Sequence, residues 1–93
     1  MQHRIQKQDQ ENIISQASAM LSRRYPHTTQ IHSERMHRNR TGHWLQLEFE
    51  TLTSPGKLRR QLFAIEKVGP CWDVWPVSQI NSSIKSEGIR VYR

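Results

Sequence analysis

The sequence predicts an α+β domain in which one N-terminal helix packs on an antiparallel sheet of three to four strands. Residues 9–24 have apolar side chains at helical spacing, which indicates one amphipathic helix. Turn-forming residues then divide the stretch 29–77 into four segments of strand-like composition. The 93 residues contain no internal repeat and no low-complexity tract, so they form one domain.

The N-terminal helix is the best-defined element. We expect the polar residues 1–8 to be flexible, so that the folded domain spans 9–93. Asp9 is the expected N-cap, and Tyr25 ends the helix because Pro26 disfavours the α conformation at the residue before it. The apolar residues that fall on one helix face are Ile13, Ile14, Ala17, Met20 and Leu21.

Two strands follow the helix. The first is expected over Thr29–His37, and the Gly42 turn (39–42) separates it from a second strand at Trp44–Leu52. In the second strand Leu45, Leu47 and Phe49 alternate with polar residues, which is typical of a half-buried antiparallel strand.

A third strand is expected over Lys57–Val68, after a turn at 53–56 that uses Pro55 and Gly56. Its buried face stays open at this point, because apolar residues occupy both faces: Leu58, Leu62 and Ala64 on one, Phe63 and Ile65 on the other.

A fourth strand is expected over Cys71–Val77, with Trp72 and Val74 in the core and Cys71 as a small buried side chain. Pro76 lacks a backbone donor, which favours a position at a sheet edge or strand end. Residues 78–85 are compatible with a short C-terminal helix, and 89–92 with a further strand or a frayed tail.

The composition favours an anionic partner. Fourteen Lys and Arg against eight Asp and Glu give a formal charge of +6, and the pI is about 10.3. Such a charge promotes association with nucleic acid or with acidic protein surfaces. The single Cys71 excludes an internal disulfide, and the polar N-terminus has no apolar signal segment, so we expect a cytoplasmic protein.

An up-and-down meander would gather the cations at two ends of the sheet, roughly 25 Å apart for strands of eight residues. Trp44 lies beside the first group, where it would either stack on a base or pack in a second small core. The first group is Arg35, His37, Arg38, Arg40 and His43. The second group is Arg23, Arg24, Lys57, Arg59 and Arg60.

Two other kinds of site were weighed. His27, His32, His37 and His43 lack the paired spacing of a zinc site, and no cofactor motif is present. His32, Glu34 and His37, with nearby arginines, supply the side chains of a metal-independent ribonuclease, with Glu48 or Glu50 as base. A helix followed by an antiparallel sheet also resembles the arrangement of small bacterial ribonuclease toxins.

The predicted α-β-β-β-α order resembles double-stranded-RNA-binding domains as well. That family has a basic run at the start of its second helix, whereas residues 78–86 contain only Lys85. The resemblance therefore does not extend to the part of the family that binds RNA.

These observations predict a non-enzymatic protein that binds nucleic acid or a nucleoprotein complex through arginine clusters, without cofactor, metal or membrane. The alternative is a small inhibitor or adaptor of the kind phages and plasmids encode, such as an anti-CRISPR, that docks on an acidic protein surface or in the nucleic-acid channel of a larger complex. The ribonuclease is the second alternative. A monomer and a homodimer are both compatible with the sequence.

Overall fold

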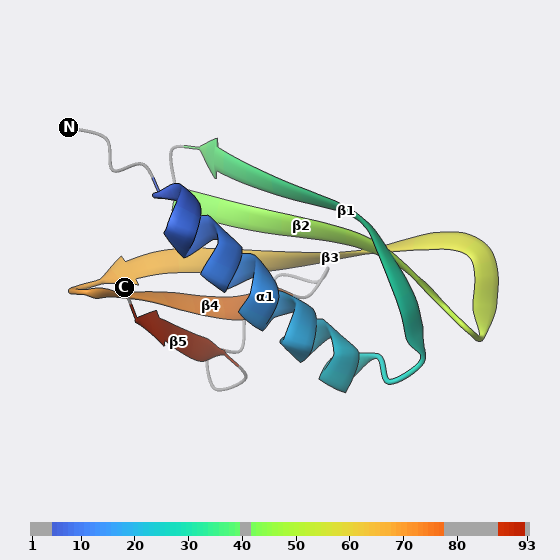
Figure 1. Ribbon diagram of the computed structural model, residues 1–93. Coiled ribbons are helices and arrows are strands. Elements are labelled where there is room, and N and C mark those ends of the chain that lie inside the picture. Colours follow the sequence, from blue (N-terminus) through green and yellow to red (C-terminus); the bar gives the residue numbers. More distant parts are fainter. Residues whose placement is uncertain (1–4, 40–41, 78–87, 93) are drawn as a thin grey trace.

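The computed structural model describes residues 5–39, 42–77 and 88–92, and shows one helix packed across a five-stranded antiparallel sheet (Figure 1). The strands lie in chain order, β1-β2-β3-β4-β5. The elements are α1 (Lys7–Arg24), β1 (Thr28–Asn39), β2 (Gly42–Thr51), β3 (Ser54–Val68), β4 (Cys71–Val77) and β5 (Ile89–Tyr92). The α+β class is confirmed, but the sheet has five strands because β5 pairs with β4. The expected C-terminal helix falls outside the described residues.

Helix α1 begins at Lys7 with Gln6 as its N-cap, so the assignment of Asp9 as N-cap was wrong. Asp9 lies in the first turn, is only 7% exposed, and accepts a hydrogen bond from the indole of Trp72. The expected apolar face is confirmed: Ile13, Ala17, Met20 and Leu21 are buried, and Ile14 packs against them. No helix in the described part of the chain is long and apolar enough to cross a membrane.

The helix ends where the sequence predicts. Tyr25 is the C-cap, and its N–H donates to the carbonyl oxygen of Leu21 over 2.8 Å. The Tyr25 ring packs on Phe49 of β2 at a centroid distance of 5.0 Å. The end of α1 is therefore fixed over the last buried residue of β2.

Strand β1 contains two irregularities that change which side chains share a face. Ile31 pairs with Phe49 and Ser33 with Glu48, so His32 is an extra residue, and Thr29 is extra in the same way. The His32 ring reaches Glu50, which lies on the sheet face opposite α1, as does the partner of His37, Trp44. Strict alternation along β1 would put His32 and His37 on opposite faces, but the bulge interrupts it and both lie on the face opposite α1.

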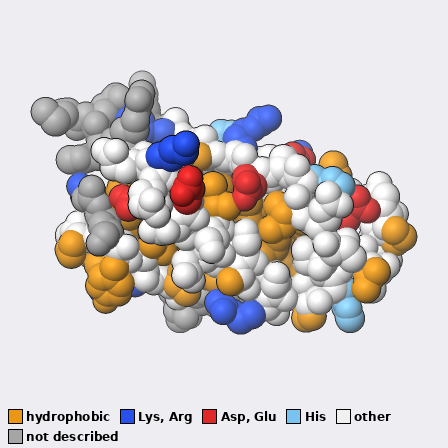
Figure 2. Space-filling model, viewed as in Figure 1, with side chains coloured by type: hydrophobic (Ala, Val, Ile, Leu, Met, Phe, Trp, Pro, Cys, Tyr) orange, Lys and Arg blue, Asp and Glu red, His pale blue; other side chains and the backbone are white. Residues whose placement is uncertain are grey.

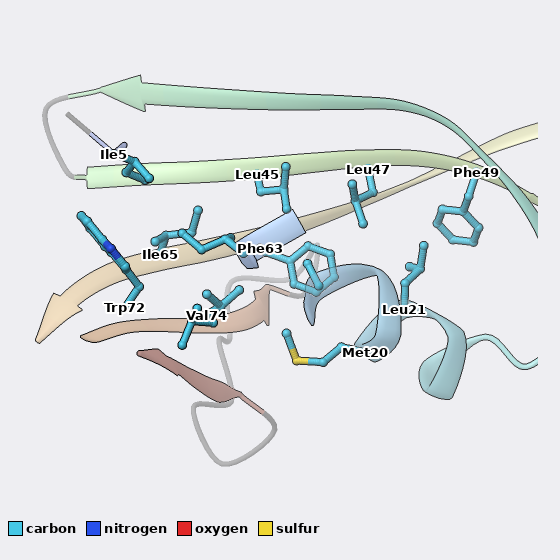
Figure 3. Close-up of a cluster of buried hydrophobic side chains, with 13 residues drawn as sticks. Ile5, Met20, Leu21, Leu45, Leu47, Phe49, Phe63, Ile65, Trp72 and Val74 are labelled. Atoms are coloured by element: carbon cyan, nitrogen blue, oxygen red, sulfur yellow. The ribbon is translucent and has the colours of Figure 1, made fainter. Parts of the chain in front are cut away.

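The core lies between α1 and one face of the sheet (Figure 3). The alternation predicted for β2 is confirmed, and so are the core positions of Trp72 and Val74 and the burial of Cys71. The structure also shows which face of β3 is buried: Phe63 and Ile65 face α1. The sheet residues of the core are Leu45, Leu47, Phe49, Phe63, Ile65, Trp72, Val74 and Val91.

The β2–β3 turn is shorter than predicted. Thr51 pairs with Ser54, so the turn consists of Leu52 and Thr53, and β3 begins three residues before Lys57. Gly56 has the expected positive φ of 78°, but inside β3, where the register between β2 and β3 shifts. The predicted turn chemistry therefore belongs to a bulge in the strand.

One of the two positions expected for Pro76, a strand end, is confirmed, because Pro76 lies near the end of β4. Strand β4 is interior to the sheet, between β3 and β5, over Cys71–Val74. Pro76 lies beyond the residues that pair with β5, and its partner is Phe63 of β3. Its missing donor therefore breaks no hydrogen bond between the described parts of β4 and β5.

Candidate nucleic-acid interface

The meander places the two groups of cations toward different ends of the sheet. The β1–β2 connection lies at one end, with Arg38 and His43 paired next to it. The β2–β3 turn and the C-terminal end of α1 lie at the other end (Figure 1). Arg40 falls outside the described residues.

The end with the β1–β2 connection is less uniformly exposed than predicted. Arg38 is exposed, but His43 is half-buried, with its ring edge-on to Trp72 at 5.7 Å and 83°. His43 therefore borders the core. Lys67, which sequence reasoning missed, also lies there, with its Nζ 6.0 Å from the centre of the Trp72 ring. Its position just before the turn at Gly69 is the sequence signal that could have predicted its place at this end.

Arg35 and His37 lie along the middle of β1, on the face opposite α1, which we call the second face. They pair with Gln46 and Trp44 of β2. Trp44 is half-buried, so it is neither fully exposed for stacking on a base nor fully packed in a second small core. Its row continues through Ala64 to Trp75 in the register, and these two residues are 7% and 8% exposed. The second face therefore has its own small apolar row, of which sequence reasoning missed Trp75.

Two carboxylates of β2 accept hydrogen bonds on the second face. Glu48 accepts a hydrogen bond from the Ser33 hydroxyl over 2.7 Å and lies 3.6 Å from the Arg60 guanidinium. The Ser33 hydrogen bond, with the charges of Arg60 and Arg35, lowers the pKa of Glu48. Arg60 is therefore partly neutralised, and Arg35 is close enough to act on the same carboxylate.

Glu50 is held in a similar way near the β2–β3 turn. Its Oε2 accepts the backbone N–H of Gly56 over 2.7 Å, and its Oε1 lies 2.6 Å from Nε2 of His32. The Gly56 hydrogen bond and the His32 ring lower the pKa of Glu50. A carboxylate with a lowered pKa is a weaker proton acceptor.

The structure separates part of the proposed ribonuclease set. His32 and His37 share the second face, together with Glu48 and Glu50. Glu34, in contrast, pairs with the buried Leu47, so it takes the register of the face that carries α1. The set is therefore rearranged from the one proposed, with Glu50 as the carboxylate bound to His32.

The remaining cations lie toward the β2–β3 end. Arg23 and Arg24 are in the last turn of α1, and Lys57 and Arg59 are on β3; all four are exposed. Within the described ranges, Arg23, Lys57 and Arg59 form no ion pair. Sequence reasoning missed the exposed apolar residues of the same end, where Leu52 is 69% and Leu58 53% exposed. Figure 2 shows hydrophobic side chains at this end of the molecule.

The two grooves that described residues line do not contain the predicted cations. An open groove of about 590 Å³ runs between α1 and β5, and none of the predicted cations lines it. In the part of the chain that the structure describes, no group of three or more His, Cys, Asp or Glu side chains is placed to hold a metal ion.

No protein-family model matches this chain, and comparisons with curated proteins and with solved structures find no match either. Function is therefore inferred from the sequence and the geometry alone.

Proposed function

We propose that this protein is a non-enzymatic binding protein that engages nucleic acid, alone or in a nucleoprotein complex, through exposed cations. One observation carries the proposal: acidic groups of the sheet are engaged within the protein, while several cations are not. Glu48, Glu50 and Asp73 contact Arg60, His32 and Arg90, respectively. Arg23, Lys57 and Arg59 point into solvent at the β2–β3 end, and Arg35 is exposed on the second face.

The physical consequence is an excess of positive charge at the β2–β3 end, where Arg23, Lys57 and Arg59 are exposed. Each Lys or Arg that meets a phosphate releases condensed counterions, and this release supplies most of non-specific affinity. Arginines that contact phosphates position a protein without reading bases. We therefore expect binding with strong salt dependence and weak sequence preference.

The two carboxylates on the second face support binding rather than catalysis. Both Glu48 and Glu50 have a lowered pKa, which makes either a poor general base near neutral pH.

Fluorescence anisotropy with labelled DNA and RNA oligonucleotides tests the proposal. We compare the double variant Arg23→Gln/Arg59→Gln with the control Lys7→Glu, which lowers the net charge by the same two units at the other end of α1. The first variant should bind about tenfold more weakly and lower the salt slope by about two, because two phosphate contacts are lost. The control should bind nearly as the wild type does. Equal losses of affinity in both variants would show that net charge alone causes the effect. This result would contradict a defined interface.

Co-purification with and without nuclease separates this function from the inhibitor or adaptor. A partner that stays bound after nuclease treatment, with no affinity of the pure protein for nucleic acid, would favour an acidic protein surface instead. RNA cleavage by the wild type that disappears in His32→Ala would overturn the non-enzymatic assignment.

A further inference from the structure

The β2–β3 hairpin ends in an exposed surface of apolar and basic side chains. We call this surface the hairpin tip, and it consists of Leu52, Pro55, Lys57, Leu58 and Arg59. Leu52 is 69% and Leu58 53% exposed, and Pro55 is exposed beside them. The cause lies in the length of α1. Its C-cap Tyr25 covers Phe49, and the hairpin continues past this point without a helix above it (Figure 1).

Hydrogen bonds, rather than burial, hold the tip in shape. The N–H of Leu52 donates to the His27 carbonyl over 2.8 Å, which ties the turn to the connection between α1 and β1. The N–H of Gly56 donates to Glu50 over 2.7 Å, and the hydroxyls of Thr51 and Thr53 are 3.1 Å apart. The leucines are thus presented in fixed positions, and a partner would lose little entropy in ordering them.

The charge of the tip indicates the kind of partner. Residues 51–59 contain Lys57 and Arg59 and no acidic residue. The nearest carboxylate in sequence, Glu50, already contacts His32 and Gly56. A complementary surface would therefore offer an apolar slot between negative charges.

Resting on the proposed function, we propose that the hairpin tip inserts into a groove of double-stranded DNA. Leu52 and Leu58 contact or wedge between base pairs, while Lys57 and Arg59 bind the flanking phosphates. The major groove of B-form DNA admits a two-stranded β-ribbon, and proteins that enter the minor groove insert apolar side chains of this kind between base steps and unstack them. The deep, narrow major groove of duplex RNA does not admit such a ribbon.

Two other anionic partners fit less well. Single-stranded nucleic acid is held by stacking on aromatic rings, and residues 51–59 contain no aromatic residue. Membrane binding grows with the buried apolar area, and two leucines and a proline offer little of it. Duplex DNA uses both properties of the tip at once.

The test uses DNA duplexes that contain 2-aminopurine, whose fluorescence rises when its base step is unstacked. We compare the wild type with Leu52→Ser/Leu58→Ser and with the control Leu62→Ser, which removes a 38% exposed leucine from the middle of the sheet. These side chains are exposed, so the variants should fold, and thermal melting checks this. We expect the tip variant to lose the fluorescence increase and about tenfold in affinity. The control should retain both.

The Lys57→Gln/Arg59→Gln variant adds an independent measure. It should keep the fluorescence change at saturation and lower the salt slope by about two. Wild-type binding without a fluorescence change, with the tip variant equal in affinity, would overturn the inference and leave the proposed function standing. Failure of the wild type to bind any DNA or RNA would overturn the proposed function itself. Tip-dependent sedimentation with phosphatidylglycerol vesicles, without DNA binding, would assign the tip to a membrane surface.

Discussion

The indole of Trp72 donates a hydrogen bond to Oδ2 of Asp9 over 3.1 Å, with both side chains buried. The two residues are 63 positions apart in the chain, so this bond joins the first turn of α1 to β4. A buried carboxylate is costly unless donors satisfy it, and the position of Trp72 therefore constrains how α1 lies on the sheet.

We expect Trp72→Phe to destabilise the protein by about 2–4 kcal/mol, because it removes indole packing and leaves the buried Asp9 carboxyl without this hydrogen-bond donor. Urea denaturation followed by circular dichroism measures the change. The matched control is Trp44→Phe, at a half-buried position on the second face. A similar loss for both variants would contradict a special role for the Asp9 hydrogen bond.

A second prediction concerns the backbone of the β2–β3 hairpin. Gly56 has φ = 78°, and a Cβ added there would meet no atom within 4 Å. Gly56→Ala should therefore cost only the conformational strain of a positive φ, about 1 kcal/mol. Gly56→Asn should cost less, since asparagine tolerates this region better. The urea midpoints of the two variants give the order, and a larger loss for asparagine would contradict the explanation by strain.

The sequence predicted the parts of the fold that depend on local pattern. The helix face and the alternation of β2 follow from spacing alone, and the end of α1 at Tyr25 follows from the local chemistry of proline. The face of β3 could not be predicted, because apolar residues occupy both of its parities. Only the register with β2 and β4 shows that Phe63 belongs under α1, while Ala64 joins Trp44 and Trp75.

The candidate site depends more strongly on tertiary structure. The bulge at His32 has no local sequence signal, yet it brings His32 to Glu50 and onto the same face as His37. The exposure of Leu52 and Leu58 likewise depends on where α1 ends relative to the hairpin. Neither fact is encoded within the segment it concerns, which is why a strand pattern alone did not reveal the hairpin tip.

The carboxylates on β2 make stability depend on pH in a defined direction. Donors lower the pKa of both Glu48 and Glu50 below the ordinary value of 4.5. A lowered pKa in the folded state stabilises the fold above about pH 4.5, and this contribution is lost as the pH falls through the folded-state value. Both side chains are half-buried and reach solvent, so the effect should be small and weakened by salt.

Urea midpoints at pH 6 and pH 3 for the wild type and for Glu50→Gln measure this contribution. The wild type should be more stable than Glu50→Gln at pH 6, and this difference should shrink toward pH 3, as the pH falls toward the lowered pKa of Glu50 and the carboxyl takes up a proton. Glu11→Gln serves as the control, because Glu11 is an exposed carboxylate of α1. A difference that grows toward pH 3 would contradict the assignment.

The last prediction concerns β5, which pairs with β4 over only four residues. The Arg90 guanidinium meets Asp73 of β4 through two contacts, Nε to Oδ1 at 2.8 Å and Nη2 to Oδ2 at 3.2 Å. This two-point geometry fixes the register of a strand too short to define it by packing alone. Asp73→Asn should therefore speed amide hydrogen exchange in 89–92 and leave exchange in β2 unchanged. High salt should reduce the difference between variant and wild type, because it screens the exposed pair. Equal exchange in 89–92 at low salt would show that Val91, buried beneath α1, suffices to hold β5 in place.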